Sequence, residues 1–144
     1  MFAKYSSYLR PKYWIMEKSL TDKIRDAFFT VHRTLGPGLP EACYEEALTR
    51  EFDEMKIPYQ RQKKFVVNYK GKPLAKTFRV DLFIDNEIII EVKSVADLLP
   101  VHHAQVIGYL RAAEKSLGFL VNFNSHLITK GIHRKVNNYE GDFD

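Results

Sequence analysis

Three neighbouring segments of strand character constrain the fold of this 144-residue chain most. Residues 62–69, 75–84 and 87–93 are rich in β-branched and aromatic side chains, and turn-forming residues at 70–73 and 85–86 separate them. The connections are short enough for neighbouring strands to pair directly. We therefore expect these segments to form a β-meander.

The surrounding segments predict helices and further strands. Ser19 and Asp22 stand at capping-box spacing before an amphipathic helix that Gly36-Pro37-Gly38 ends. A second helix is expected between Pro40 and Pro58, and a third over residues 98–115. Residues 117–123 are typical of a buried strand, and residues 126–136 of a last edge strand or extension. This order of elements predicts an α/β fold, with helices flanking a central mixed β-sheet.

The length predicts one domain, because 144 residues are too few for two ordinary cores. We expect the domain to span residues 19–137, with an N-terminal appendage at 1–18 and a tail at 138–144. Residues 1–18 show no sustained helical or strand period, and Met16 is an alternative start just before the first helix.

Composition limits the functional classes. The net charge of +4 and the pI near 9.1 mildly favour a polyanionic partner. Cys43 is the only cysteine, which excludes an intramolecular disulfide and a cysteine-based zinc cluster. No apolar run reaches the ~18–20 residues that a membrane-spanning helix needs. We expect a cytoplasmic protein that does not enter the membrane.

The segment EIIIEVK contains the first candidate site residues. Strand residues two apart share a face, so Glu91 and Lys93 point to the same side of the sheet. The apolar residues Ile88, Ile90 and Val92 point to the other side. A carboxylate and an ammonium group therefore end an otherwise apolar strand together.

Asp81 is the polar residue of the preceding apolar strand. The residues expected on the opposite face are Phe78, Val80, Leu82 and Ile84. A hairpin about residues 85–86 would bring Asp81 nearly across from Glu91. Such carboxylates bind Mg²⁺ or Mn²⁺ well, and the backbone carbonyl of Val92 is a candidate further ligand.

Lys93 is expected to act beside that metal. Its ammonium group can orient the attacking water, favour the deprotonated form of that water and neutralise charge on a phosphate. Asp, Glu and Lys in strands are more often solvated or joined in ordinary ion pairs. The three together, at the ends of strands dominated by Ile, Val, Leu and Phe, favour a site.

Asp81 followed by Glu91-Val92-Lys93 resembles the D…(D/E)xK motif of the PD-(D/E)xK nuclease superfamily, with Val80 in place of the usual proline. Residues 38–44, GLPEACY, match the signature of the small GxxExxY family, which is similar to that superfamily. The resemblance runs from about Leu20 to about Lys135. It implies a restriction-endonuclease-like fold, a divalent cation and products with a 5′-phosphate.

The resemblance also implies roles for residues outside the meander. Glu41 is the position that would complete the metal site from the preceding helix, although a carboxylate in a first helical turn is equally explained by the helix dipole. Tyr44 is expected to pack in the core with its hydroxyl satisfied. Gln105 and Tyr109 share a helix face and resemble the QxxxY motif of RecB-like and lambda-exonuclease-like nucleases. That motif implies that Gln105 arranges the site and that Tyr109 lies near the substrate.

These observations predict a Mg²⁺- or Mn²⁺-dependent nuclease that acts on DNA or RNA, in repair, recombination or defence. The QxxxY spacing favours end-processing, whereas the small size equally suits a junction-resolving endonuclease that works as a homodimer. The alternative is a catalytically silent module that binds nucleic acid or a protein partner, because fold does not imply function.

Overall fold

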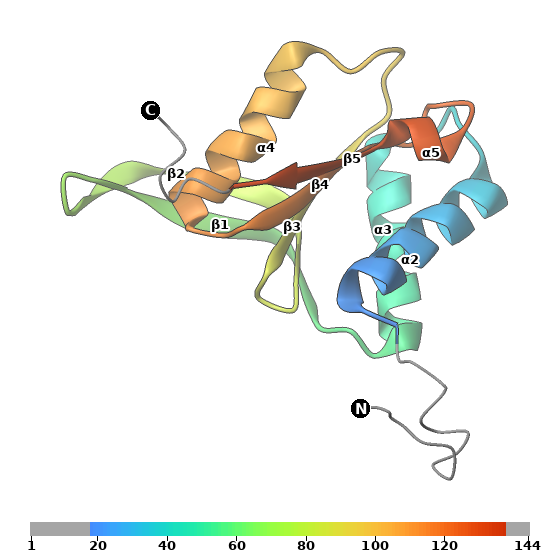
Figure 1. The fold of residues 1–144 in the computed structure, drawn as a ribbon, viewed down its shortest axis with the longest axis horizontal. Coiled ribbons are helices and arrows are strands. Elements are labelled where there is room, and N and C mark those ends of the chain that lie inside the picture. Colours follow the sequence, from blue (N-terminus) through green and yellow to red (C-terminus); the bar gives the residue numbers. More distant parts are fainter. Residues whose placement is uncertain (1–17, 138–144) are drawn as a thin grey trace, which may run out of the picture.

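The computed structural model describes residues 18–137, which form a five-stranded sheet with helices against both faces (Figure 1). The strands are β1 (Tyr59–Tyr69), β2 (Lys72–Ile84), β3 (Ile88–Lys93), β4 (Leu117–Asn122) and β5 (Ile132–Val136). The helices are α2 (Leu20–Leu35), α3 (Glu41–Met55), α4 (Pro100–Ala113) and the short α5 (Ile128–Gly131). The predicted α/β fold with a mixed central sheet is confirmed.

The strands follow one another in the sheet in the order β1-β2-β3-β4-β5. Among these five strands only β3 and β4 pair in parallel, and α4 is the crossover between them. The predicted meander is therefore confirmed for β1 to β3. Asp85 and Asn86 both have positive φ, 52° and 56°, in the three-residue connection from β2 to β3. The Glu87 amide donates to the Ile84 carbonyl at 2.9 Å, and Ile84 pairs with Ile88, so Asp81 falls in register with Glu91.

The predicted limits of the first helix are confirmed. The Ser19 side chain accepts a hydrogen bond from the Asp22 backbone amide at 3.2 Å, which caps the start of α2. Gly36 ends the helix with φ of 69°, a conformation that costs glycine little. Pro40 immediately precedes α3, where its missing N–H leaves no helical hydrogen bond unmade.

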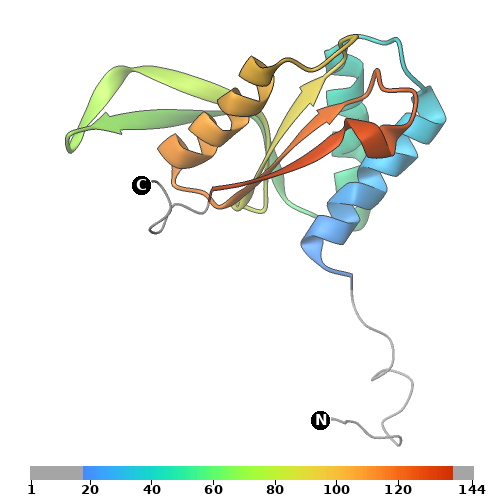
Figure 2. The ribbon, with the colours of Figure 1, turned by 45° about the horizontal axis from the view of Figure 1, so that its top comes forward.

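Two apolar clusters hold the helices against opposite faces of the sheet (Figure 2). Helices α2 and α3 pack on the face that carries Ile88, Ile90 and Val92. Helix α4 packs on the other face, against Ile89 and Leu120. Alternation along β3 is as predicted, and it directs Glu91 and Lys93 to the α4 side.

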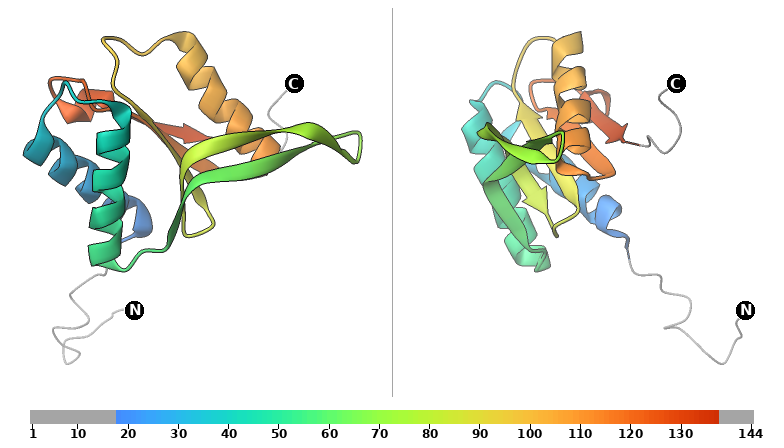
Figure 3. Two further views of the ribbon diagram at one scale, coloured as in Figure 1. Left: turned by 180° about the vertical axis from the view of Figure 1, so that it is seen from behind. Right: turned by 90° about the vertical axis from the view of Figure 1, so that its left-hand side faces the viewer.

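Alternation along β2 changes at Asp81, where the sequence prediction is wrong. Leu82 and Ile84 join the cluster under α2 and α3, but Phe78 and Val80 join the cluster under α4. The change coincides with the end of β2–β3 pairing at Leu82 and Ile90. Beyond this point β1 and β2 continue as a two-stranded ribbon, which extends away from the rest of the sheet in the left view of Figure 3.

The last predicted strand is only partly confirmed, because residues 128–131 form α5 before β5 begins. A Cβ at Gly131 would overlap the Asn122 carbonyl oxygen and lie 2.7 Å from Ser125 Oγ. Only glycine fits this close approach, which directs the chain into the edge strand β5.

The predicted tail at 138–144 and the N-terminal appendage, apart from Lys18, lie outside the described residues, as does Met16. Within residues 18–137, no helix has both the length and the apolar character needed to cross a membrane.

Candidate active site

Asp81 and Glu91 lie where β2 and β3 separate, and their side chains replace the backbone pairing there. The Asp81 backbone amide donates to Glu91 Oε2 at 2.7 Å. The Val92 backbone amide donates to Asp81 Oδ2 at 2.8 Å. Each carboxylate thus satisfies a backbone donor of the opposite strand. These two hydrogen bonds hold both carboxylates, which we call the crossed pair, at the point where the strands separate.

Burial makes this pair electrostatically costly. Glu91 is only 6% exposed, and burial, with the charge of Asp81 as the next cause, raises its pKa to about 8. Burial is also the main cause of the raised pKa of Asp81. The charge of Lys93 acts in the opposite direction on both groups. A positive charge bound between the carboxylates would remove this penalty.

Lys93 supplies positive charge without closing an ion pair. Its side chain is half-buried on the same face of β3 as Glu91. Within residues 18–137, no carboxylate oxygen lies within 4.0 Å of its ammonium nitrogen. Lys93 is therefore close enough to influence Asp81 and Glu91 while its ammonium group keeps its donors for another molecule.

Helix α3 presents two carboxylates toward the site, and they make different contacts. Glu41 Oε2 accepts a hydrogen bond from the Ser94 backbone amide at 3.2 Å. Glu45 is buried, and its Oε1 accepts from Gln62 Nε2 at 3.1 Å. Gln62 Nε2 also donates to Asp81 Oδ1 at 3.3 Å. Glu45, rather than Glu41, is thus joined to the crossed pair through one amide.

Sequence reasoning missed Glu45 and Gln62. Glu45 follows Glu41 by four residues, so it occupies the same helix face, and this spacing was a usable signal. Gln62 has a backbone φ of 50° inside β1, which is rare for a residue other than glycine. Nothing in the neighbouring sequence predicts this conformation or the contacts of Gln62.

The GLPEACY segment connects the α2–α3 loop to the end of β3. The Tyr44 hydroxyl donates to the Gly36 carbonyl at 2.5 Å and accepts from the Leu39 amide at 3.1 Å. Ser94 Oγ donates to the Leu39 carbonyl at 2.6 Å. Tyr44 is fully buried, so its predicted structural role is confirmed. These bonds hold the loop against the residue that follows Lys93.

The segment after Lys93 is also fixed from β4. The Phe123 amide donates to the Lys93 carbonyl at 2.9 Å. The Asn122 side chain accepts from the Val95 amide and donates to the Val95 carbonyl, at 3.1 and 2.9 Å. Lys93 therefore stands on backbone that is held from both sides, which limits how far its side chain can move.

Tyr109 and Gln105 approach the site from α4. The Tyr109 ring stacks on Phe78 with centroids 4.6 Å apart. Burial raises the pKa of Tyr109, and the charges of Glu91 and Asp81 raise it further, whereas Gln105 acts in the opposite direction. Tyr109 therefore lies within electrostatic range of both carboxylates, with the exposed Gln105 beside it.

The donor set fits a hard divalent cation. Asp81 Oδ1 and Glu91 Oε1 are the carboxylate oxygens not bonded to backbone amides. Among residues 18–137, no group of three or more His, Cys, Asp and Glu side chains is arranged to hold a metal. Mg²⁺ and Mn²⁺ are commonly held by one or two carboxylates with water, whereas zinc needs three or four protein ligands. The pair therefore suits Mg²⁺ or Mn²⁺.

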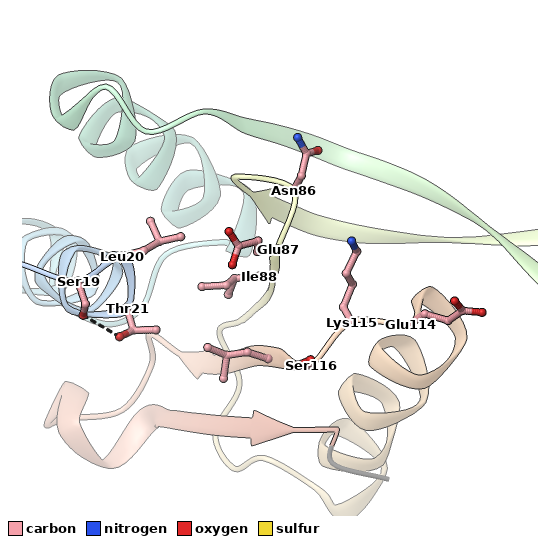
Figure 4. A pocket seen from close by; sticks show the side chains of 10 residues that line it. Ser19, Leu20, Thr21, Asn86, Glu87, Ile88, Glu114, Lys115 and Ser116 are labelled. Carbon is pink, nitrogen blue, oxygen red and sulfur yellow. Dashed lines mark hydrogen bonds between the residues drawn. The ribbon is translucent and has the colours of Figure 1, made fainter. Parts of the chain in front are cut away.

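A hollow of about 400 Å³ lies at the opposite end of β3 (Figure 4). It is bordered by the start of α2, the β2–β3 turn and the segment between α4 and β4. Its acidic residues Glu87 and Glu114 are exposed, unlike Glu91. Burial and paired charge coincide at the crossed carboxylates and not in this hollow, so the crossed carboxylates are the stronger candidate site.

Comparison with known proteins identifies one family. The family model described as the PD-(D/E)XK nuclease superfamily matches residues 18–135, which contain every described element except the last residue of β5. No curated protein matches the chain. The mixed sheet with flanking helices is the restriction-endonuclease-like fold expected of this superfamily.

Proposed function

The chain belongs to the PD-(D/E)XK nuclease superfamily, and from this membership we propose that it is a metal-dependent nuclease that hydrolyses phosphodiester bonds in DNA. The observation that carries the proposal is the crossed pair of Asp81 and Glu91, buried at a strand separation with Lys93 beside it. Two neighbouring carboxylates with raised pKa values form a site that a divalent cation would stabilise.

Each residue has a proposed role in this reaction. Asp81 and Glu91 would hold Mg²⁺ or Mn²⁺, with the Val92 carbonyl as a further ligand, and the cation would stabilise charge on the phosphate. Lys93 orients the attacking water and favours its deprotonated form. Tyr109 contacts the substrate, and Gln105 arranges the site beside it.

We propose Glu45 as the acidic contribution of α3, in preference to Glu41. Glu45 shares the Gln62 amide with Asp81, and its charge is among the causes that raise the pKa of both Asp81 and Glu91. Glu41 instead bonds the backbone after Lys93, so it would act by positioning β3.

Finer assignments are part of the same proposal. The contacts of Glu41 and Tyr44 support membership of the GxxExxY family, because both residues of the motif hold the loop before α3 in place. A role in repair, recombination or defence and a cytoplasmic location, where the exposed Cys43 would stay reduced, complete the proposal.

The decisive experiment is a cleavage assay with purified protein. Single-stranded, duplex and branched DNA and RNA are each incubated with Mg²⁺, with Mn²⁺ and with EDTA. Glu91→Gln and Lys93→Ala test the site, and Glu87→Gln, an exposed carboxylate at the β2–β3 turn, is the matched control. We expect metal-dependent cleavage of DNA that both site variants reduce at least ~10³-fold, since each removes a group needed at the transition state.

The other outcomes have definite meanings. Cleavage that survives both site variants would indicate a contaminating enzyme and contradict the mechanism. DNA binding without cleavage would favour the catalytically silent module instead. Paired nicks in branched DNA would indicate a junction-resolving homodimer, whereas progressive loss from ends would indicate an exonuclease.

A further inference from the structure

The outer part of the β1–β2 ribbon, residues 63–80, which we call the arm, concentrates the positive charge of the protein. It contains six of the 22 Lys and Arg residues and none of the 18 Asp and Glu residues. The rest of the chain therefore has 16 basic and 18 acidic residues, a slight negative excess. The basic character of the whole protein comes from the arm alone.

The arrangement of these charges does not favour folding. Lys64 and Arg79 are both exposed and stand directly opposite each other across the two strands. Like charges in that position destabilise a β-ribbon. Within residues 18–137, neither has a carboxylate within 4.0 Å. Lys63 and Lys70 lie over the rings of Phe65 and Tyr69, at 5.7 and 5.6 Å, rather than beside anions.

The arm is joined to the candidate active site by a continuous strand and by packed aromatic rings. Its β2 strand continues directly into Asp81. At its base Phe65 stacks on Phe78 with centroids 5.4 Å apart, and Phe78 stacks on Tyr109 of α4. These contacts anchor the base of the arm beside the site, so its charges lie along the direction in which β2 leaves Asp81.

The shape of the arm suits a long ligand. Beyond the strand separation it consists of two strands only, and it projects from the body in Figures 1 to 3. Val80 and Lys72 stand eight residues apart on β2, a length of roughly 26 Å at ~3.3 Å per residue. That length corresponds to about eight base pairs at ~3.4 Å each. Val66, Tyr69 and Leu74 expose apolar surface between the basic residues.

We propose that the arm binds duplex DNA on one side of the phosphodiester bond that the active site cleaves, an inference that rests on the proposed nuclease function. A two-stranded ribbon fits the major groove of B-form DNA. The major groove of A-form RNA is too deep and narrow for side chains to read. The unneutralised Lys and Arg residues match the phosphates, and release of counterions drives the association.

The test compares two variants that lose the same charge. The arm variant carries Lys70→Gln, Lys72→Gln and Lys76→Gln, and the control variant carries Arg33→Gln, Lys130→Gln and Arg134→Gln on other elements. All six side chains are exposed, so both variants should fold, which circular dichroism verifies. Binding of a labelled 30-base-pair duplex by the full chain is measured by fluorescence anisotropy in EDTA over a salt series.

We expect the arm variant to bind at least ~10-fold more weakly and to have a salt slope smaller by about 2 to 3, because each phosphate that is no longer neutralised lowers the slope by ~0.9. The control variant should reduce the slope by less than ~1. Equal effects in the two variants would overturn the proposal, because net charge alone would then explain binding. If binding of a duplex RNA weakened as much in the arm variant as binding of duplex DNA, the assignment to DNA would be overturned.

Failure of this inference differs from failure of the proposed function. Binding is measured without a divalent cation, so it does not depend on cleavage. If the protein cleaves DNA and the arm variant binds DNA as well as the wild type does, only the proposed role of the arm is refuted. If the arm binds DNA but the protein cleaves no substrate, only the proposed nuclease function is refuted.

Discussion

The two halves of β2 differ in what their residues do. Leu82 to Ile84 are buried and pair with β1 on one side and β3 on the other. Residues 72–79 pair with β1 only, and all of them except the half-buried Phe78 are exposed. Asp81 lies near the boundary, where a side-chain carboxylate replaces the backbone pairing. One half of β2 thus packs in the body of the protein, and the other half presents charged side chains to solvent. The candidate active site lies between the two halves, at Asp81, a region that we call the junction.

The largest difference in stability should come from replacing a leucine by alanine in each half of β2. Leu82→Ala should lower the free energy of unfolding by ~2–5 kcal/mol, because Leu82 is fully buried and a cavity would remain. Leu74→Ala, on the arm at 44% exposure, should change it by less than ~0.5 kcal/mol. Urea denaturation measures both. Similar decreases in the two variants would mean that the arm is part of the cooperative core.

The junction should show a pH dependence of stability that neither half shares. Without metal, burial raises the pKa of Glu91 from 4.5 to about 8. Between these values the folded state holds a proton that the unfolded state releases. The contribution of Glu91 to the free energy of unfolding should therefore be largest below pH 4.5. It should fall by about 2–4 kcal/mol as the pH rises to 8.

Thermal unfolding in EDTA from pH 5 to pH 8 measures this dependence. Glu91→Gln should flatten it, whereas Glu87→Gln, which removes an exposed carboxylate, should leave it intact. Addition of Mn²⁺ at pH 8 should raise the melting temperature of the wild type and not that of Glu91→Gln. An unchanged slope in Glu91→Gln would show that another group titrates.

The contribution of α3 to the junction should be measurable as metal affinity. Glu45→Gln should weaken Mn²⁺ binding ~10–100-fold, the range typical for residues that support a metal site. Glu46→Gln is the matched control, because Glu46 is the adjacent exposed residue and bonds Arg50 at 3.0 Å. Calorimetric titration measures both. A larger decrease in affinity for Glu41→Gln than for Glu45→Gln would favour Glu41 as the acidic residue of α3 that supports the metal site.

The smallest effect should have the opposite sign for folding and for binding. Arg79→Gln relieves the like-charge pair with Lys64, so the free energy of unfolding should rise by ~0.2–0.5 kcal/mol. Duplex binding should weaken at the same time, because one fewer positive charge faces the phosphates. Unfolding curves and anisotropy on one preparation test both. A decrease in stability would mean that Arg79 supports the ribbon.

Local patterns predicted much of the fold because they reflect short-range physics. Alternation along β3 placed Glu91 and Lys93 on one face, and the short turn that includes residues 85–86 brought Asp81 to Glu91. The capping residue Ser19 and the terminating Gly36 gave the limits of α2. The division of residues 128–136 into α5 and β5 was missed, because it depends on how closely Gly131 approaches Asn122.

The sequence by itself determined that Asp81, Glu91 and Lys93 are candidate site residues, because residue type and strand alternation can be read from neighbouring positions. Only the tertiary structure decided how they are connected: the crossed hydrogen bonds, the role of Glu45 and the change of face along β2. The physical reason is that these features depend on residues far apart in the chain, as when the Gln62 side chain of β1 bonds both Glu45 of α3 and Asp81 of β2. Those are long-range contacts, and no local period encodes them.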